Sequence, residues 1–343
     1  MSKLRRYLSW FILGICTVIL IGACDRVSET SLGDRSNVPD EESCRLVKHS
    51  MGKTEICGQP QRVAALSPHI LDSILSLGVQ PIAYAEENDF SIQTYDNPVE
   101  QIPYIGKWVT TQPKGLGDRK SPSLERLTLV KPDLILGEQW LHQEEYPLLS
   151  QIAPTLLFND EQADGQQFWQ QDIQGIAQAV DREDRAQELI AEFEQQIAQV
   201  RTILQPIRQI YPRILLIGSN LTTYVASQPQ STIARLLKEI GFEIVQPQEL
   251  QGYAEISWEI LPQIETDIIL VLSWSDDSVS HPEVVLRQKW ANNPLLSSME
   301  VFQQGRVYFV DYQLWGSVIG GPLTDQLLLE ALPDLLLGSV NEN

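Results

Sequence analysis

The chain has 343 residues, with 25 lysines and arginines against 45 aspartates and glutamates. The net charge of −20 argues against binding to nucleic acid or to an anionic membrane surface through bulk electrostatics. A charged fraction of 20% and the presence of eight tryptophans exclude collagen-like, coiled-coil and largely disordered classes. What remains is an acidic globular body whose length suits about two domains.

The first residues have the organisation of a secretory signal. Three basic residues precede an apolar run over residues 8–21, and two small residues then precede Cys24. The run is shorter than the roughly 20 apolar residues of a membrane span, and the sequence after it is polar. We therefore predict that residues 1–23 are a cleaved signal peptide; an uncleaved single-pass anchor is the alternative. Both interpretations place the body of the protein outside the cytoplasm.

The stretch that ends at Cys24 resembles a bacterial lipobox, in which the cysteine becomes lipidated. Residues 24–42 are polar and lack periodicity, which predicts a flexible tether between the lipid and the body. In an oxidising compartment the next two cysteines, Cys44 and Cys57, are expected to pair. Turn residues lie midway between them, so the disulfide would close a β-hairpin; two unpaired thiols are the alternative.

Short apolar runs alternate with helical patterns from residue 62 onward. The runs that predict buried strands are 62–67, 79–85, 133–137, 213–219, 242–245 and 267–273. Helical patterns cover 69–78, a stretch opening at Ser123, 231–241, a stretch near Ser257, and 323–332. Alternation of this kind is typical of parallel sheets covered by helices on both faces.

Two of these helix–strand units repeat one another. Residues 123–136 align without gaps on residues 257–270, and both have the pattern S-x-E-x-L-x-x-h-x-x-D-h-I-L, in which h is apolar. Any helix–strand unit needs the apolar positions, but Ser, Glu and Asp in register are much harder to obtain by chance. The repeat predicts two lobes of one α/β design.

A long helical stripe over residues 182–205 lies between the two lobes. A helix of this length spans about 33 Å, which is enough to cross from one lobe to the other; a surface helix of a single domain is the alternative. We expect an N-terminal lobe with its hairpin at 43–165, a bridging helical segment at 166–206 and a C-terminal lobe at 207–343. The predicted fold is α/β, with two Rossmann-like lobes and parallel-rich sheets bridged by a single long helix.

This assembly resembles the substrate-binding lipoproteins of bacterial ABC importers for ferric siderophores, ferric citrate, haem and cobalamin. The stretches that carry the resemblance are the hairpin before PQRVAALS, then SPSLERLTLVKPDLILG, LLSQIAPTLLF and GRVYFVD, with IPYIGKWVTTQPKGLGDRKSPSLERL matching the ferric-siderophore branch. The resemblance implies that a ferric siderophore of the citrate or hydroxamate type is captured between two lobes and delivered to a permease and its ATPase. It also implies a monomer without enzymatic activity; haem and cobalamin are alternative cargoes.

In that family one glutamate on each lobe docks into an arginine pocket of the permease, and Glu125 and Glu259 occupy the matching positions. The alternative is that each glutamate complements a helix N-terminus, with Ser123 or Ser257 as the cap, and the two roles are compatible. Asp25, directly after the lipidated cysteine, matches the inner-membrane retention signal of Gram-negative lipoproteins. The resemblance thus implies a periplasmic protein that a lipid holds at the inner membrane.

Ligands of open α/β sheets lie beyond the carboxyl ends of the strands. Aromatic residues concentrate in the loops expected there, and aromatics pack against the organic shell of a bulky chelate. The alternative for each tryptophan is a place in the hydrophobic core. The predicted ligand-contacting residues are Lys107, Trp108, Arg119, Trp140, Tyr224, Trp274 and Trp315.

The distribution of charge suggests the sign of the ligand. Residues 85–102 hold five acids and no base, whereas residues 105–120 hold four bases and one acid. A basic patch on so acidic a body predicts an anionic chelate; an exposed loop of mixed charge is the alternative. In the family a basic residue of this loop contacts siderophore oxygens, and Lys107 and Arg119 are the nearest matches.

The sequence offers no recognised catalytic or metal-binding motif. Its four histidines form no HExxH, there is no CxxC, and the G-x-S-x-G, P-loop and G-x-G-x-x-G patterns are absent. We expect no cofactor and no direct metal ligand, so that iron arrives already chelated. His69 as an axial haem ligand, and a secreted α/β hydrolase based on paired carboxylates, are the alternatives that the sequence leaves open.

Overall fold

The structure is a computed structural model. It describes residues 43–87, 97, 99, 102, 104–158, 169–221, 225–228, 231–246, 255–275, 281–316 and 320–338. The chain separates into two units, residues 1–41 and 42–343, and all of the described residues belong to the second. The predicted signal peptide, the tether and the lipidated Cys24 lie outside the described residues.

A two-stranded antiparallel hairpin opens the described part of the chain. It consists of β1 (Cys44–His49) and β2 (Gly52–Cys57), and a disulfide joins the two cysteines, which form the first register pair. Gly52 has a φ of +126°, in a region that residues with a Cβ rarely adopt, and this permits the tight turn. The guanidinium of Arg45 docks the hairpin on the body by donating to two backbone carbonyls near the end of a later helix.

Five strands form the sheet of the N-terminal lobe. They are β3 (Val63–Ala65), β4 (Ala83–Glu86), β5 (Lys114–Asp118), β6 (Leu134–Glu138) and β7 (Thr155–Phe158). Their order across the sheet is β5-β4-β3-β6-β7, and every neighbouring pair is parallel. The central position of β3, with later strands added on both sides, is the Rossmann-like arrangement that the sequence predicts.

Helices cover both faces of this sheet. They are η2 (Gly106–Trp108, a 3-10 turn), α1 (Pro68–Ser76), α3 (Leu124–Val130), α4 (Gln139–His142), α5 (Tyr146–Ile152) and α6 (Trp169–Val180). Apolar residues that alternate along the strands bind the two layers. In β3, Val63 and Ala65 pack with α1 and α6, whereas Ala64 packs with α3 and α5.

The C-terminal lobe is built on a second sheet of five strands. They are β8 (Arg213–Asn220), β9 (Val225–Ser227), β10 (Glu243–Ile244), β11 (Ile268–Trp274) and β12 (Val307–Asp311). The order β10-β8-β11-β12 is parallel throughout, and β9 pairs antiparallel with β8. Its helices are η3 (Leu261–Gln263, a 3-10 turn), α9 (Thr232–Ile240), α10 (Pro282–Ala291), α11 (Pro294–Ser297), α12 (Glu300–Gln303), α13 (Tyr312–Trp315) and α14 (Pro322–Gly338).

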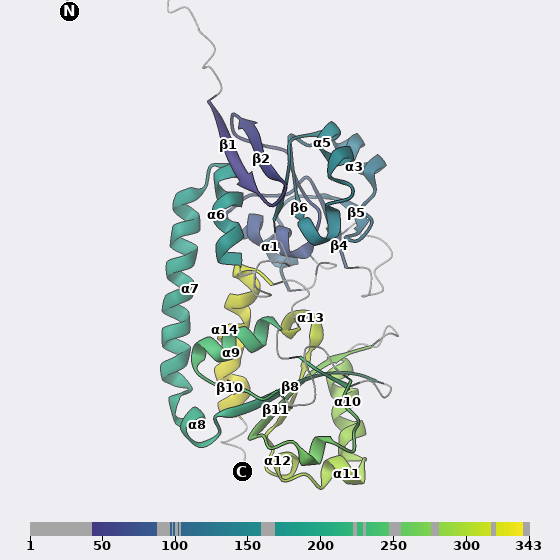
Figure 1. Ribbon diagram of the computed structural model, residues 1–343, viewed down its shortest axis with the longest axis vertical. Helices are drawn as coiled ribbons and strands as arrows, with labels where there is room; N and C mark the ends of the chain where they lie inside the picture. Colours follow the sequence, from purple (N-terminus) through teal and green to yellow (C-terminus); the bar gives the residue numbers. More distant parts are fainter. Residues whose placement is uncertain are drawn as a thin grey trace, which may run out of the picture. The chain divides into compact units, whose positions relative to one another are not determined.

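The bridge between the lobes is helical. After α6, α7 (Glu183–Ile203) runs for 21 residues and is followed by the short α8 (Gln205–Ile210). α7 packs on α6 of the first lobe and on α9 and α14 of the second, and Figure 1 shows it running alongside both lobes. Its buried stripe is the one that the helical pattern predicts: Ala186, Leu189, Phe193, Ile197 and Val200.

The predicted helix near Ser257 is wrong. The chain makes turns at residues 258–260 and then only the 3-10 turn η3 before β11. Pro262 explains the difference, because proline lacks the backbone N–H that a continuing helix would use. The aligned residue of the first lobe is Thr128, which lies inside α3. The last helix, in contrast, is longer than predicted and continues to Gly338.

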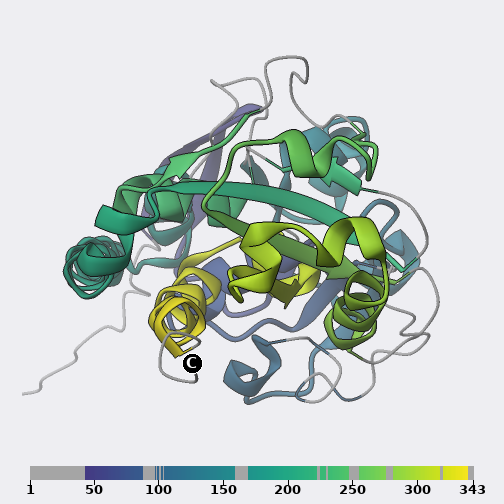
Figure 2. The same cartoon turned by 90° about the horizontal axis from the view of Figure 1, so that it is seen from below.

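One hydrophobic cluster, which we call the shared core, runs through both lobes. It includes inward residues of β3 and β6 in the first sheet, of β8 and β11 in the second, and the buried stripe of α7. Figure 2 shows α7 and α14 nearly end-on beside one another, at the side of the molecule where the lobes join. None of the helices among the described residues combines the length and apolar character needed to cross a membrane.

Candidate ligand-binding site

Each sheet has a position where the strand order reverses. It lies between β3 and β6 in the first lobe and between β8 and β11 in the second. Ligands of such sheets bind outside the carboxyl ends of the strands at this position. Polar residues are buried at these ends, namely Ser67, Glu138, Ser219 and Ser273.

Two contacts join the lobes near the carboxyl ends of β3 and β12. Nδ1 of His69, at the start of α1, donates to the carbonyl of Gly320, and the hydroxyl of Tyr104 donates to the carboxylate of Asp311. His69 follows β3, and Asp311 ends β12. We call the region between the carboxyl ends of β3, β4 and β6 and those of β8, β11 and β12 the interlobe edge.

Three glutamates surround an arginine at this edge. Glu86 ends β4, Glu87 follows it, and Glu138 ends β6; the three residues are 1%, 2% and 2% exposed. The Arg119 guanidinium pairs with Glu87, and the Lys120 ammonium lies 3.2 Å from the same carboxylate. We call these five residues the Glu–Arg cluster.

Two of the predicted ligand residues meet beside this cluster. The Arg119 guanidinium lies 5.5 Å from the centre of the Trp140 ring, within the range of a cation–π contact. The Trp140 indole N–H donates to the Glu138 carboxylate. Trp140 is half-buried, so its ring presents both an apolar surface and a charged neighbour to the interlobe edge.

Burial shifts the pKa of the Glu86 carboxyl. It raises the pKa of this carboxyl to about 7, the backbone N–H of Glu87 and the charge of Arg119 oppose the shift, and the charge of Glu87 adds to it. Oε1 of Glu86 accepts from the N–H of Glu87, whereas Oε2 has no hydrogen-bond partner among the described residues. A carboxylate oxygen buried in this way has a vacant acceptor position.

Glu138 keeps its charge in spite of its burial. Burial acts to raise the pKa of Glu138, but the charges of His69 and Arg119 and the hydrogen bonds from Ser67 and Trp140 outweigh it. Its pKa therefore lies below the usual value. Glu138 is a fixed negative charge at the reversal point of the first sheet.

His142 holds the backbone of two strand ends in place. With Nε2 as the donor, it bonds the carbonyl of Arg119 at 2.8 Å, and its Nδ1 accepts from the N–H of Glu138 at 3.1 Å. Burial lowers the pKa of His142 against the effect of these partners, so the ring is neutral, as this arrangement requires. A Cβ at Gly137 would lie 2.9 Å from Nδ1, which explains the glycine beside the ring.

Behind the edge, Asp72 of α1 caps the first turn of α14. Its buried carboxylate accepts from the backbone N–H of Leu323 at 2.8 Å, from that of Thr324 at 2.9 Å and from the Thr324 hydroxyl at 2.8 Å. The N-terminus of a helix favours a negative charge at this place. Burial raises the pKa of Asp72 to about 6, against the effect of these bonds.

His69 is a buried cation next to this cap. Burial acts to lower its pKa, but the hydrogen bond and charge of Asp172, the charge of Glu138 and the Gly320 carbonyl raise the pKa to about 9. Its Nε2 lies 3.6 Å from the Asp172 carboxylate. Both ring nitrogens therefore face protein atoms, and neither points to open space as an axial haem ligand would.

The C-terminal lobe contributes aromatic surface. Trp274 ends β11, and its ring lies 5.3 Å from that of Tyr312 at an angle of 54°. Both residues are half-buried at the interlobe edge. Trp315, in contrast, is 6% exposed and belongs to the shared core, which is the alternative that the sequence left open for each tryptophan. Tyr224 lies outside the described residues.

Lys107 and Trp108 lie at the opposite end of the first sheet. The Trp108 carbonyl accepts from the side chain of Gln80, which precedes β4, and the Lys107 ammonium lies 4.2 Å from the centre of the Trp108 ring. Lys114 begins β5 and so lies at this amino end too, whereas Arg119 follows the carboxyl end of β5. The four bases of this segment therefore do not form one patch.

Glu125 and Glu259 are exposed at equivalent places of the two lobes. Glu125 lies in the first turn of α3, where the Ser123 hydroxyl accepts from a backbone N–H at 3.3 Å. Glu259 lies in the turns before η3, and its own N–H approaches the Ser257 hydroxyl at 3.4 Å. Of the two, only Glu125 has an α-helix N-terminus available, because the element directly after Glu259 is the 3-10 turn η3.

Several residues of the edge were not among the predicted ones. Glu87 and Asp311 stand at or directly after a buried strand, the position that served to choose the aromatic residues. The sequence signal for both is an acidic residue at or directly after the end of an apolar run. His142 gave no signal, because its two backbone partners come from different strands.

The other site predictions concern cysteines and metal ligands. Cys44 and Cys57 form the disulfide across the open end of the hairpin. Within the described ranges, no three His, Cys, Asp or Glu side chains are placed so that they could hold a metal ion. That iron arrives already chelated stays a prediction.

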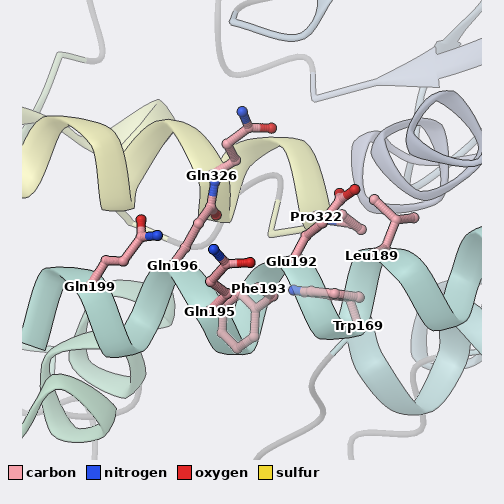
Figure 3. A pocket seen from close by; sticks show the side chains of 9 residues that line it. All are labelled: Trp169, Leu189, Glu192, Phe193, Gln195, Gln196, Gln199, Pro322 and Gln326. Carbon is pink, nitrogen blue, oxygen red and sulfur yellow. The ribbon is translucent and has the colours of Figure 1, made fainter.

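A pocket of about 320 Å³ lies apart from the interlobe edge, between α7 and α14. Figure 3 shows glutamine side chains of both helices in it, with the rings of Trp169 and Phe193. The indole of Trp169 donates to the buried carboxylate of Asp325 at 2.8 Å, so this ring is held by the interior of the protein. The residues of the Glu–Arg cluster do not line this pocket.

Comparisons with known proteins identify the family. The profile of the periplasmic binding protein family matches residues 63–314, from the first strand of one sheet to the end of the other, and the chain belongs to this family. The chain is 26% identical to the Fe(3+)-citrate-binding protein YfmC of Bacillus subtilis, over 89% of this chain and 90% of the relative. It is 25% identical to the ferric-anguibactin-binding protein FatB of Vibrio anguillarum, over 79% of this chain and 80% of the relative.

A solved structure confirms the two-lobed α/β fold. The crystal structure of SirA of Staphylococcus aureus, complexed with staphyloferrin B, has a TM-score of 0.67 and 22% identity, and it covers 87% of this chain and 98% of that one. At this identity the likeness concerns the fold. It agrees with two parallel-rich sheets joined by one long helix, as the sequence predicts.

Proposed function

We propose that this protein is the substrate-binding component of an ABC importer and captures a ferric siderophore between its lobes. The observation that carries the proposal is that the segments after the carboxyl ends of strands in the two sheets contact one another, with Trp140 after β6 on one lobe and Trp274 at the end of β11 on the other. Membership of the periplasmic binding protein family and relatives named for ferric citrate and ferric anguibactin support it. Such a protein binds and releases its ligand unchanged, so no enzymatic activity is proposed.

The proposal extends to the partners. We propose that the exposed Glu125 and Glu259 dock the two lobes on the permease, which its ATPase then drives. We propose further that Cys24 carries the lipid and that the protein acts as a monomer on the periplasmic side of the inner membrane. The lipobox and Asp25 support this location, and the equivalent exposure of the two glutamates supports the docking role.

Tryptophan fluorescence tests the ligand assignment. Residues 25–343, the mature protein without the cysteine proposed to carry the lipid, would be titrated with ferric citrate, a ferric hydroxamate, haemin and cyanocobalamin, with correction for the absorption of each ligand. We expect saturable quenching with one ligand per protein for a ferric chelate, because Trp140 and Trp274 lie at the interlobe edge. Trp140→Phe and Trp274→Phe should each reduce the quenching. Trp290→Phe should not, because Trp290 belongs to a separate hydrophobic cluster of the second lobe, on the face of its sheet away from the shared core.

The outcomes separate the cargo from the transport role. Saturation by haemin or cyanocobalamin alone would keep the binding role and replace the cargo. If none of the four ligands binds, the proposed function is contradicted.

A further inference from the structure

At the first lobe, the interlobe edge has no surplus of positive charge among the described residues. Arg119 and Lys120 both pair with Glu87. His69 is matched by Asp172. Glu138 and Glu86 then remain as further carboxyl groups of the same edge. The basic residues that the sequence places close together are thus neutralised by acids that come from other strands.

The second lobe does not reverse this balance. Asp311 ends β12, and Glu283 of α10 lies near enough to act on its charge. Lys289 and His281 oppose them, but the Lys289 ammonium donates to the backbone carbonyl of Leu221 after β8. His281, whose charge would act on Asp311, lies 3.1 Å from the Glu283 carboxylate. The described residues on both sides of the edge are therefore neutral to negative in sum.

Two buried atoms of opposite hydrogen-bonding character in the Glu–Arg cluster lack a hydrogen-bond partner among the described residues, namely the acceptor Oε2 of Glu86 and the donor Nε of Arg119. Oε2 of Glu86 has no hydrogen-bond partner among the described residues, although the residue is 1% exposed. A buried oxygen without a donor costs free energy, and a ligand N–H or ammonium that approached it would recover part of that cost. The unpaired Nε–H of Arg119 would equally gain from an acceptor, so the balance of charges at the edge, and not these two atoms, decides the sign of the ligand.

Ferric siderophores differ in net charge, and this difference changes their affinity for a site lined by carboxylates. Three hydroxamates balance the charge of ferric iron, so their complex is neutral, and an amine arm makes it cationic. Catecholate and citrate chelates retain negative charge. A ligand of one sign gains or loses Coulomb energy with every carboxylate near it, and low dielectric makes the effect larger at a partly enclosed site.

We infer, on the basis of the proposed function, that the interlobe edge selects ferric chelates of zero or positive charge, of the hydroxamate kind, over anionic citrate or catecholate chelates. The Glu–Arg cluster offers an anionic chelate no uncompensated positive charge. Trp140 and Trp274 supply apolar surface for the organic shell, and a cationic arm would also gain from the faces of their rings. This selection is the opposite of the one that the linear density of bases predicts.

The experiment compares chelates that differ only in charge. Ferrioxamine B carries a free ammonium; acetylation of that amine gives a neutral complex, and succinylation gives an anionic one. Fluorescence titration should find the ammonium and acetyl forms binding about tenfold more tightly than the succinyl form, or better. Added salt should weaken binding of the ammonium form and leave that of the acetyl form nearly unchanged.

A charge-removing substitution tests the origin of the selection. Glu87→Gln frees Arg119 and Lys120 from their common partner, so it should raise the affinity for the succinyl form and lower that for the ammonium form, each by about tenfold. The matched control is Glu188→Gln, an exposed glutamate of α7 that should leave all three affinities unchanged. The comparison of the three chelates on the unmodified protein stands even if Glu87→Gln fails to fold.

The possible results are distinct. Binding of the succinyl form as tight as that of the ammonium form would overturn the inferred selection and leave siderophore capture in place. An equal response of the Glu188→Gln control would assign the selection to the overall charge of the protein and overturn the role of the cluster. The absence of binding by any ferric chelate would remove the proposed function and, with it, this inference.

Discussion

His69 carries its positive charge inside the protein because three elements supply partners for it. Asp172 comes from α6, Glu138 ends β6, and the Gly320 carbonyl belongs to the segment before α14. A buried cation without such partners would lose its proton. The charge of this one residue therefore depends on the correct packing of both lobes.

We expect this arrangement to make the stability of the protein depend on pH above neutrality. A histidine whose pKa rises from 6.5 to about 9 on folding stabilises the folded state fully below pH 6.5, and the contribution is lost as the pH rises through 9. It amounts to about 3 kcal/mol. Urea unfolding across this pH range should show a falling free energy of unfolding for the native sequence and a flatter dependence for His69→Asn.

The control for this prediction is His281→Asn. His281 is exposed, with a glutamate as its ion-pair partner, so the variant should keep the slope of the native sequence. Asp72 does not interfere, because its pKa rises from 3.8 to about 6 and its stabilising contribution is lost as the pH rises through that lower range. Equal slopes for His69→Asn and the native sequence would contradict the assignment of the buried charge.

At the scale of elements, the first turn of α14 depends on a glycine. A Cβ at Gly321 would lie 2.6 Å from Oδ1 of Asp72, whose carboxylate is fixed by its three hydrogen bonds to the same turn. Either the aspartate or the helix would have to move. At this point the backbone of α14 and the Asp72 side chain of α1 leave no room for a side chain at residue 321.

Gly321→Ala should lower the free energy of unfolding by about 1 to 3 kcal/mol, since a methyl group added to a filled interior displaces its neighbours. The matched control is Gly338→Ala at the other end of the same helix, where an added Cβ meets no atom within 4 Å. That variant should be neutral or slightly stabilising, because alanine favours helix more than glycine does. Thermal unfolding of the two variants measures the difference; equal effects would refute the close contact.

The elements that the sequence predicts well are those with local signals at both ends. α9 begins after Ser231, whose hydroxyl accepts from the N–H of Ala234, and ends at Gly241 with a φ of +106°. The helix expected near Ser257 does not form, although its apolar pattern matches that of the first lobe, because Pro262 lies within the segment. The apolar periodicity of this segment indicates which side chains can be buried. Whether the segment can form a helix depends on the backbone N–H that proline lacks.

The candidate site was less predictable than the fold. The ends of the strands could be located, and with them Trp140, Trp274 and Arg119. The sequence could not reveal that Glu87, from the end of another strand, neutralises that arginine, because the pairing depends on β4 and β5 being neighbours in the sheet. The net charge of residues 105–120 in the sequence therefore differs from the net charge at the interlobe edge, where acids from other strands are present.

At the scale of the whole molecule, the shared core makes the two lobes one cooperative unit. The apolar stripe of α7 packs with the inner faces of both sheets, so neither lobe can unfold without exposing part of the other. We expect a single calorimetric transition whose enthalpy equals the van't Hoff value. Leu127→Ala should leave a cavity in the separate hydrophobic cluster that packs on the other face of the first sheet. The substitution should lower the temperature of the transition without splitting it in two. Two resolved transitions would contradict the prediction.

The docking proposal also belongs to this scale, because it needs both lobes at once. The double substitution Glu125→Ala with Glu259→Ala should reduce uptake of the ferric chelate to background while the affinity for the chelate stays unchanged. Both carboxylates are exposed and lie outside the Glu–Arg cluster, which is the reason to expect normal binding. Radiolabelled iron uptake in cells, with titration of the purified variant, measures the two effects.

Its control replaces two other exposed glutamates, Glu188 and Glu300, with alanine and so removes the same charge. That variant should transport normally. A loss of chelate affinity in the first variant, or a loss of uptake in both, would remove the docking role.

The disulfide of the hairpin determines how the body responds to tension. Cys44 and Cys57 close the end of the hairpin at which the preceding chain enters, and the hairpin turn lies at the far end. A force that pulls on residue 43 passes through the disulfide to Cys57 and onward to β3, so β1 and β2 lie outside the path that bears the load. A protein tethered by its N-terminus to a moving membrane could therefore be pulled without having its first two strands unzipped.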